Sequence, residues 1–176
     1  MHYVNQSLGP DEEIVHVGKF HWFYNVSACM AIVWGFVWAF AIVFGGVYLH
    51  EFGFGPLEGE NVFIKAMNLH VGFRIAGFLM ILLGLLKCAQ MFVVKASTEI
   101  AITNNRLVYK RGLVARRVGE ISIDRIEGVN VVQGILGRIF NFGRLIVRGM
   151  GVGEVFLPPI ADPIAFRKAI ERARMI

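Results

Sequence analysis

Two long apolar stretches stand out in the pattern of hydrophobic and polar positions along the chain. Residues 26–49 contain no charged side chain and would form a helix about 36 Å long, whereas a bilayer's hydrocarbon core is about 30 Å thick. Residues 75–94 are nearly as apolar but include Lys87 and Gln90. A core helix of a water-soluble protein usually keeps a polar face over such a length. The pattern therefore predicts a transmembrane α-helical hairpin of two spans.

After the second stretch the pattern changes from a helical period to a strand period. Ile100 and Ile102 alternate with other residues, and Asn104-Asn105 fits a two-residue turn because asparagine tolerates a positive φ. Further strand-like segments, separated by turn residues, follow at 106–111, 114–123, 126–132, 144–149 and 154–157. Short strands at this spacing predict a mainly-β domain, either a sandwich or an antiparallel barrel of six to seven strands.

The last residues predict an amphipathic helix. Asp162 suits the N-cap and Pro163 the first helical position. Apolar residues then recur three, four and seven positions after the first of them, which places them on one face. They are Phe166, Ala169, Ile170 and Ala173. Such a face needs an apolar surface to cover, and the open end of a small barrel would provide one.

These elements divide the chain into three parts. Residues 1–25 are predicted to be a cytoplasmic lead-in ending in aromatic side chains suited to the headgroup interface, and residues 14–17 could form a short strand that pairs with the later domain. Residues 26–94 form the hairpin, with an external loop at 50–74. Residues 95–176 form the cytoplasmic β domain and its helix.

Charge predicts the orientation of the hairpin. From Lys95 onward the chain has 14 lysines and arginines but only seven aspartates and glutamates, so this part carries a net charge of +7. Positively charged segments next to membrane spans stay on the cytoplasmic side. Both termini are therefore expected in the cytoplasm and the loop between the spans outside it.

The sequence predicts neither catalysis nor a cofactor. Both cysteines, Cys29 and Cys88, lie in the apolar stretches, and the five histidines include no metalloprotease-type pair, so neither a disulfide framework nor a metal site is expected. The glycines at 149–153 join two strands and open no helix, which argues against a phosphate loop. Lys87 would suit a transport role, but the spans contain no ionisable partner for it.

Three groups of residues are candidates for contacts with lipid or protein. A set of basic residues could bind lipid or protein, or could simply be the ordinary positive charge of a cytoplasmic domain. An apolar patch could contact a partner or the bilayer, or could instead fill the core of the barrel. A stripe of small residues could pack against the second span or against another subunit. The basic residues are Lys110, Arg111, Arg116, Arg117, Arg138, Arg144 and Arg148. The apolar patch is Ile135, Leu136, Ile139, Phe140 and Phe142. The stripe is Ser27, Ala31, Gly35 and Ala39.

Several stretches of the chain carry a resemblance to a known family. They are 98–106 (TEIAITNNR), 110–113 (KRGL) with Arg116-Arg117, 124–127 (DRIE), 133–138 (QGILGR), 142–143 (FG) and 160–163 (IADP), with Asp11-Glu12-Glu13 and His21-Trp22 in the lead-in. Over nearly its whole length the chain resembles the bacterial pleckstrin-homology (PH) membrane proteins. The resemblance implies a PH-like barrel capped by the C-terminal helix and a place in the bacterial inner membrane, but it implies no activity.

One feature of other PH domains is not expected here. Eukaryotic PH domains that bind phosphoinositides use basic residues in a roomy loop between their first two strands. Taken as that connection, Asn104-Asn105 is too short and carries no charge. The resemblance therefore does not imply a phosphoinositide site.

The combined features favour a binding module that is not an enzyme. It would self-associate or hold a protein partner at the inner membrane, and the resemblance itself hints at assembly. One alternative is a sensor of anionic lipids acting through the basic face; another is an accessory subunit of a transporter or membrane enzyme. Nucleic acid is not expected as a partner, because the domain is tethered at the membrane, and no small-molecule substrate is evident.

Overall fold

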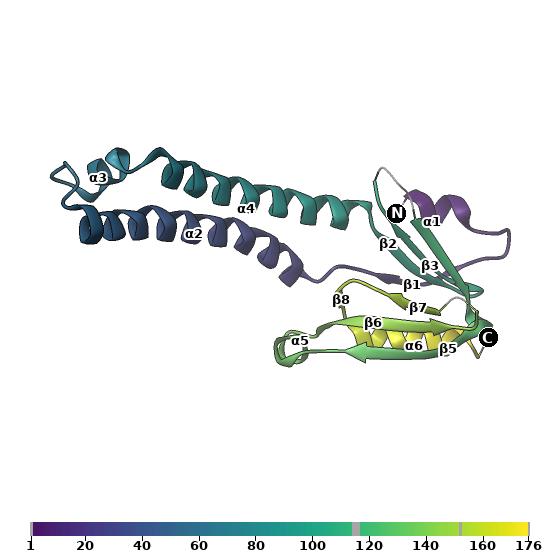
Figure 1. Ribbon diagram of the computed structural model, residues 1–176. Coiled ribbons are helices and arrows are strands. Elements are labelled where there is room, and N and C mark those ends of the chain that lie inside the picture. The colour runs from purple at the N-terminus through teal and green to yellow at the C-terminus, as the bar shows by residue number, and fades with distance from the viewer. Residues whose placement is uncertain (1, 114–116, 152, 176) are drawn as a thin grey trace. The chain divides into compact units, whose positions relative to one another are not determined.

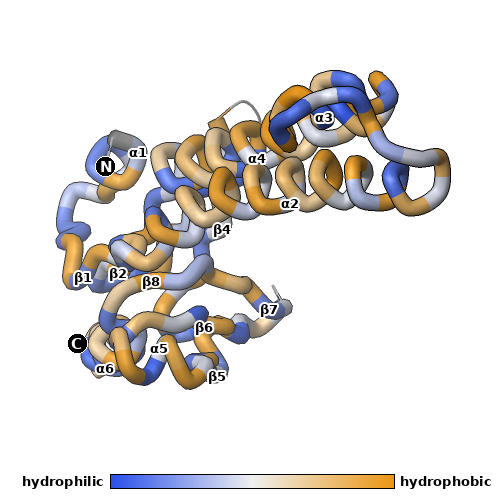
Figure 2. The backbone as a smooth tube through the Cα atoms, turned by 90° about the vertical axis from the view of Figure 1, so that its left-hand side faces the viewer, coloured by the Kyte–Doolittle hydropathy of each residue, from blue (hydrophilic) through white to orange (hydrophobic). Residues whose placement is uncertain are grey.

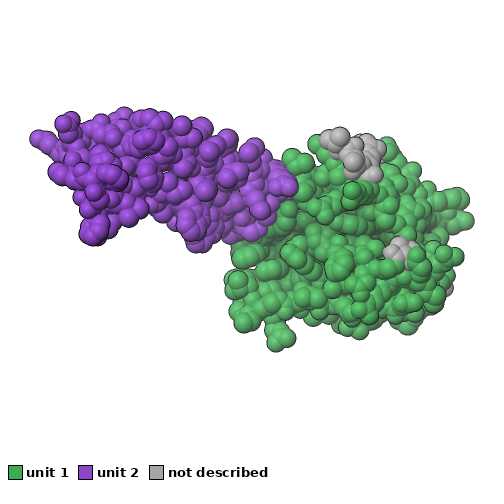
Figure 3. Space-filling model, viewed as in Figure 1, with its two compact units in different colours: residues 1–24, 93–176 green, residues 25–92 purple. Residues whose placement is uncertain are grey.

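The chain folds into two compact units. The computed structural model describes residues 2–113, 117–151 and 153–175. One unit is residues 25–92, and the other combines residues 1–24 with residues 93–176 (Figure 3). Residues 1–24, which precede the hairpin in sequence, thus belong to the same compact unit as the β domain.

The first unit is a helical hairpin. Helix α2 (Trp22–Phe54) is followed by the short α3 (Val62–Asn68) and by α4 (Val71–Ser97), and both long helices are long and apolar enough to cross a membrane (Figures 1 and 2). Large side chains such as Trp34, Trp38 and Phe40 are more than half exposed on the helix surface. This exposure is the reverse of what a core helix of a soluble protein shows, and lipid is the solvent that suits it.

The hairpin helices approach each other through small residues. A Cβ atom added to Gly84 of α4 would lie 2.7 Å from the carbonyl oxygen of Ala31, and one added to Gly35 would lie 2.9 Å from that of Met80. Gly35 and Ala39 are buried between the helices. Glycine and alanine allow two backbones to pack this closely, so Ala31, Gly35 and Ala39 of the stripe face α4.

The second unit contains two antiparallel sheets. The first has the order β1-β2-β3-β4 and consists of β1 (Ile14–Gly18), β2 (Glu99–Thr103), β3 (Arg106–Arg111) and β4 (Arg117–Ser122). Residues 14–17 were expected to pair with the later domain, and the pairing of β1 with β2 confirms this. Because β1 precedes the hairpin and β2 follows it, the hairpin is inserted between the first two strands.

This connectivity corrects the expectation about the loop between the first two strands. Asn104 and Asn105 join β2 to β3 and not β1 to β2. The connection between β1 and β2 is residues 19–98, which include the whole hairpin. The place of the basic loop of phosphoinositide-binding PH domains is thus taken by the helices themselves.

The second sheet has the order β5-β6-β7, and β8 also pairs with β6. Its strands are β5 (Ile126–Val132), β6 (Phe142–Gly149), β7 (Gly153–Phe156) and β8 (Ile160–Ala161). The mainly-β, PH-like fold is confirmed, and the part of the chain that the structure describes contains eight strands in place of the expected six to seven. The sheets do not close into a barrel among the described residues: a 3₁₀ turn, η1 (Ile123–Arg125), separates β4 from β5, and the sheets meet at an isolated bridge between Phe20 and Ile160.

The core lies between the two sheets and helix α6 (Pro163–Ala173). The predicted apolar face of α6 is buried, with Phe166 and Ile170 fully so, and the helix contacts β1, β2, β5 and β6. Asp162 precedes the helix as expected, but its side chain makes no capping bond. Its carboxylate accepts a hydrogen bond from the amide of Asn141 instead. Two short helices, α1 (His2–Ser7) and α5 (Ile135–Ile139), complete the unit.

Candidate functional site

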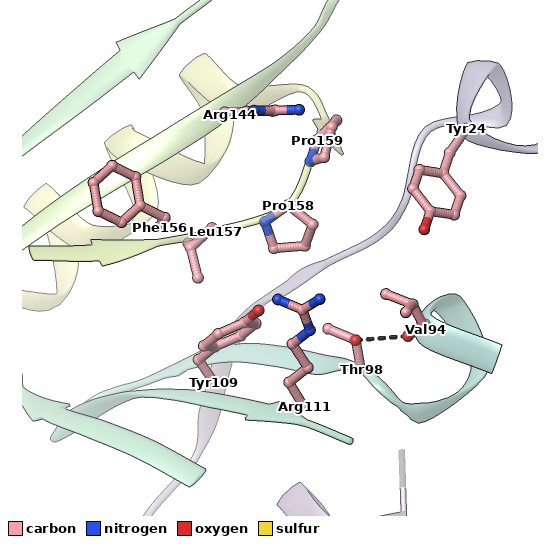
Figure 4. Close-up of a pocket in the computed structure, with 10 residues that line it drawn as sticks. All are labelled: Tyr24, Val94, Thr98, Tyr109, Arg111, Arg144, Phe156, Leu157, Pro158 and Pro159. Atoms are coloured by element: carbon pink, nitrogen blue, oxygen red, sulfur yellow. Dashed lines mark hydrogen bonds between the residues drawn. The ribbon is translucent and has the colours of Figure 1, made fainter. Parts of the chain in front are cut away.

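A cleft of about 250 Å³ opens in the second unit between β3 and the segment that follows β7 (Figure 4). Arg111 extends from β3 on one side and Arg144 from β6 on the other, with Pro158 and Pro159 between them. The complete lining is Tyr24, Val94, Thr98, Tyr109, Arg111, Arg144, Phe156, Leu157, Pro158 and Pro159.

Strand geometry explains why these side chains share a cavity. Tyr109 and Arg111 are two positions apart on β3, so both project from the same face of the first sheet. On the other wall, the backbone N–H of Leu157 donates to the carbonyl of Leu145 at 2.9 Å and holds the chain after β7 beside β6. Pro158 and Pro159 then lead the chain away, since proline has no N–H to continue the ladder.

The ends of the hairpin helices supply the remaining wall. Tyr24 lies in the first turn of α2, and Val94 and Thr98 lie at the end of α4 and just beyond it. The Thr98 hydroxyl donates to the Val94 carbonyl at 2.6 Å and satisfies one of the last carbonyls of the helix. All three residues belong to the same compact unit as the strands, so the cleft is built within one unit.

The cleft carries positive charge that is not neutralised. Within the described part of the chain, neither Arg111 nor Arg144 forms an ion pair, and both side chains are exposed to solvent. Arg111 also stands directly opposite Arg117 of β4 in the strand register. Like charges opposed across two strands are unfavourable unless an anion or solvent screens them. This corner of the sheet therefore suits an anionic ligand.

Three other predicted basic residues, Lys110, Arg138 and Arg148, do not line this cleft. The ammonium of Lys110 pairs with Glu99 at 3.3 Å and lies 5.3 Å from the Tyr3 ring centroid, and Arg148 pairs with Glu154 at 2.6 Å. Arg138 is exposed on α5. Arg116 lies outside the described residues. Of the basic set, only Arg111 and Arg144 are brought together around one cavity among the residues that the structure describes.

The other candidate groups are also separate from the cleft. Ile135, Leu136, Ile139 and Phe140 are exposed on and beside α5, while Phe142, the first residue of β6, is half-buried. Lys87 is exposed on the surface of α4, and it has no ion-pair partner in the part of the chain that the structure covers. This position gives no support to a transport role, because transporting side chains usually face a bundle interior or a water-filled path.

Sequence reasoning missed the uncharged half of the cleft. Tyr24, Thr98 and Tyr109 come from three separate segments, and only the pairing of β1 with β2 across the hairpin brings them together. The Pro158-Pro159 pair was the one local signal, because two prolines after a strand end its ladder. No group of three or more histidine, cysteine or acidic side chains that could hold a metal occurs among the described residues.

Comparison with known proteins identifies the fold family. A family model described as Bacterial PH domain matches residues 14–174. The match begins at the first residue of β1 and extends past the end of α6, so it includes both sheets and the inserted hairpin. No curated protein and no solved structure matches the chain.

Proposed function

The chain belongs to the bacterial PH domain family, and from that premise we propose that it is a membrane-anchored binding module that holds a phosphate-bearing lipid headgroup in the cleft of Arg111 and Arg144. The hairpin anchors the module, and the cleft selects the lipid. No catalytic step is part of the proposal.

The observation that carries the proposal is the pair of guanidinium groups without acidic partners among the described residues, on opposite walls of one cleft. A guanidinium offers a fork of N–H donors that matches phosphate oxygens. The phenol hydroxyl of Tyr109 in the same lining adds a neutral donor. This set of groups favours a phosphate-bearing ligand over an uncharged or apolar one.

The position of the cleft along the chain favours a lipid as the source of that phosphate. Tyr24 and Val94, which line it, are each within two residues of the hairpin unit. Because each helix residue advances the chain by only about 1.5 Å, the cleft lies close to the points where the helices leave the bilayer. The excess of basic residues after Lys95 supports placing it at the cytoplasmic leaflet of a bacterial inner membrane.

Binding of soluble short-chain lipids to the full-length protein in a neutral detergent tests the proposal. Replacing both Arg111 and Arg144 by glutamine should weaken binding of dihexanoyl phosphatidylglycerol about 30-fold, because each arginine near an anionic headgroup contributes about 1 kcal/mol. Native mass spectrometry of the protein–lipid complex measures the change. Lys168→Gln is the control. Lys168 is exposed on α6 and does not line the cleft, so this substitution removes a positive charge without touching the proposed site.

The arms of the titration separate the sources of phosphate. The proposal expects tight binding of the anionic lipid, weak binding of dihexanoyl phosphatidylcholine and weak binding of glycerol 3-phosphate. Equal binding of the anionic lipid by wild type and double variant would refute the cleft as its site. Tighter binding of glycerol 3-phosphate than of the lipid would assign the cleft to a soluble phosphate ester.

Protein assembly, the function first favoured by the sequence, has its own supporting observation. Strand β4 pairs only with β3 among the described strands, so its other side is an open edge, and Val118 on this strand is 38% exposed. An open edge can pair with a second chain, and a lysine on such an edge opposes pairing. If copies pair through β4, Val118→Lys should convert a dimer in detergent to a monomer by sedimentation equilibrium, while Lys168→Gln should not.

A further inference from the structure

Residues 133–142, which join β5 to β6 and include the first residue of β6, are here named the α5 loop and are held in one tight conformation. The side-chain amide of Gln133 donates to the carbonyls of Phe142 at 3.1 Å and of Gly137 at 3.3 Å. A Cβ atom on Gly137 would lie only 2.5 Å from the Phe142 carbonyl oxygen, so glycine is required there. The sequence therefore builds a compact loop in which α5 is closely packed onto its own base.

This compact loop presents apolar side chains outward. Ile135 is 83% exposed, Ile139 68% and Leu136 53%. None of them belongs to the core clusters formed by the described residues. Clustered exposed aliphatic residues on a rigid support are costly in water and mark a surface that contacts a membrane or another molecule.

The base of the α5 loop is packed onto the start of helix α2. The Phe140 ring lies 5.8 Å from the Trp22 ring and 6.1 Å from the Phe23 ring, and Phe142 stacks on Phe23 at 4.9 Å. His21 stacks on the other ring of the base, Phe142, at 5.1 Å. Helix α2 continues without a break from Trp22 into the apolar residues that suit a membrane span. These aromatic contacts place the α5 loop at the turn of α2 where the chain would enter the bilayer.

The charge around the α5 loop also favours an anionic lipid surface. No aspartate or glutamate occurs in residues 128–153, whereas Arg138 lies within α5 and Arg144 follows it. Arg138 is exposed among the aliphatic residues and can reach headgroup phosphates while they enter the acyl boundary. A protein partner could also cover the apolar side chains, but the contact of the α5 loop with the start of α2, a helix suited to enter a membrane, favours the bilayer over a protein.

We propose that the α5 loop is a third membrane contact of the protein, in which Ile135, Leu136 and Ile139 insert into the headgroup–acyl boundary of the cytoplasmic leaflet. The contact fixes the orientation of the β domain on the bilayer. It does not depend on whether the cleft of Arg111 and Arg144 binds a headgroup, because different side chains form it.

Depth-dependent fluorescence quenching of the full-length protein in lipid nanodiscs tests the inference. In a background carrying Cys29→Ala and Cys88→Ala, an environment-sensitive NBD label is attached through Ile135→Cys. The matched control is Met150→Cys, because Met150 is also exposed, at 57%, and follows the opposite end of β6. Circular dichroism confirms that both labelled variants fold as the parent does.

The proposal expects several-fold stronger quenching by phosphatidylcholine spin-labelled near its headgroup at position 135 than at position 150, and the reverse order for soluble iodide. Replacing Phe23 by leucine removes its ring stacks on Phe140 and Phe142 and should reduce lipid quenching at position 135. Equal iodide access at both positions would overturn the proposal. Shielding from iodide without lipid quenching would overturn it as well, because a protein surface would then cover the loop.

Discussion

Gly84→Ala is expected to destabilise the helical hairpin by about 1–3 kcal/mol, although alanine is the better helix former. The added methyl group would lie 2.7 Å from the carbonyl oxygen of Ala31 and 3.2 Å from the Cα atom of Gly35. These neighbours are backbone atoms, which cannot rotate out of the way as a side chain can. The helices must therefore move apart along the contact between them, and the packing of Gly35 and Ala39 is weakened.

Gly45→Ala provides the matched control in the same hairpin. A Cβ atom at Gly45 would meet no atom within 4 Å, so this substitution should leave the hairpin unchanged or stabilise it by up to about 1 kcal/mol through helix propensity. Unfolding of the full-length protein by SDS in mixed micelles, followed by circular dichroism, measures both. Effects of the same sign and size at Gly84 and Gly45 would show that the helices do not touch at Gly84.

Local patterns in the sequence were enough to locate most elements. The apolar stretches predicted α2 and α4, the short strand-like segments predicted β2 to β7 but not β8, and the apolar face of residues 166–173 predicted α6. Each of these signals is contained in one short segment. Both helices extend beyond the apolar stretches because backbone hydrogen bonding continues into the residues that flank them.

Contacts between distant segments could not be predicted in this way. The pairing of β1 with β2 spans the whole hairpin, so the short strand at 14–18 could be proposed but its place in the sheet could not be derived. For the same reason the sequence could not show which basic side chains pair with an acid and which do not. Lys110 and Arg111 are neighbours, yet among the described residues only Lys110 pairs with an acid, Glu99 on the adjacent strand.

The second large effect is expected at Glu12, which ties the N-terminal segment to the first sheet. Its carboxylate accepts hydrogen bonds from Arg106 at 2.8 and 2.9 Å, from the Thr103 hydroxyl at 2.6 Å and from the backbone N–H of Gly9 at 2.9 Å. Arg106 also donates to Glu120 and to the carbonyl of Ser7. The Glu12 side chain is 4% exposed, so this is a buried acceptor with a charged partner.

Glu12→Ala should therefore lower the free energy of unfolding of the β domain by about 3 kcal/mol. The substitution leaves the buried hydroxyl of Thr103 with fewer acceptors and the partly buried guanidinium of Arg106 with one carboxylate in place of two. Urea unfolding of the full-length protein in mild detergent, followed by circular dichroism, measures the loss. Glu127→Ala is the control, because Glu127 is exposed on β5 and forms no ion pair within the described residues.

The same site predicts how stability depends on pH. Burial alone would raise the pKa of Glu12, but the hydrogen bonds from Arg106, Thr103 and Gly9 outweigh it and lower the pKa from 4.5 to about 2. The unfolded chain then binds a proton more readily than the folded chain. The stabilisation is complete above about pH 5 and is lost as the pH falls toward 2, by about 2 kcal/mol, since solvent at the partly exposed Arg106 screens part of the interaction.

Glu12→Gln isolates this contribution, because glutamine keeps the size of the side chain but does not titrate. The variant should be less stable than wild type at pH 7, and the difference should shrink as the pH falls from 5 to 3. Some acid sensitivity should remain in the variant. Burial opposes the ionised form of Glu99, but hydrogen bonds from Val4, Tyr3 and Lys110 lower its pKa. The contribution of Glu99 to the stability of the fold is therefore also lost as the pH falls. A constant difference across this pH range would mean that the Glu12 carboxylate is not held by Arg106 in the folded protein.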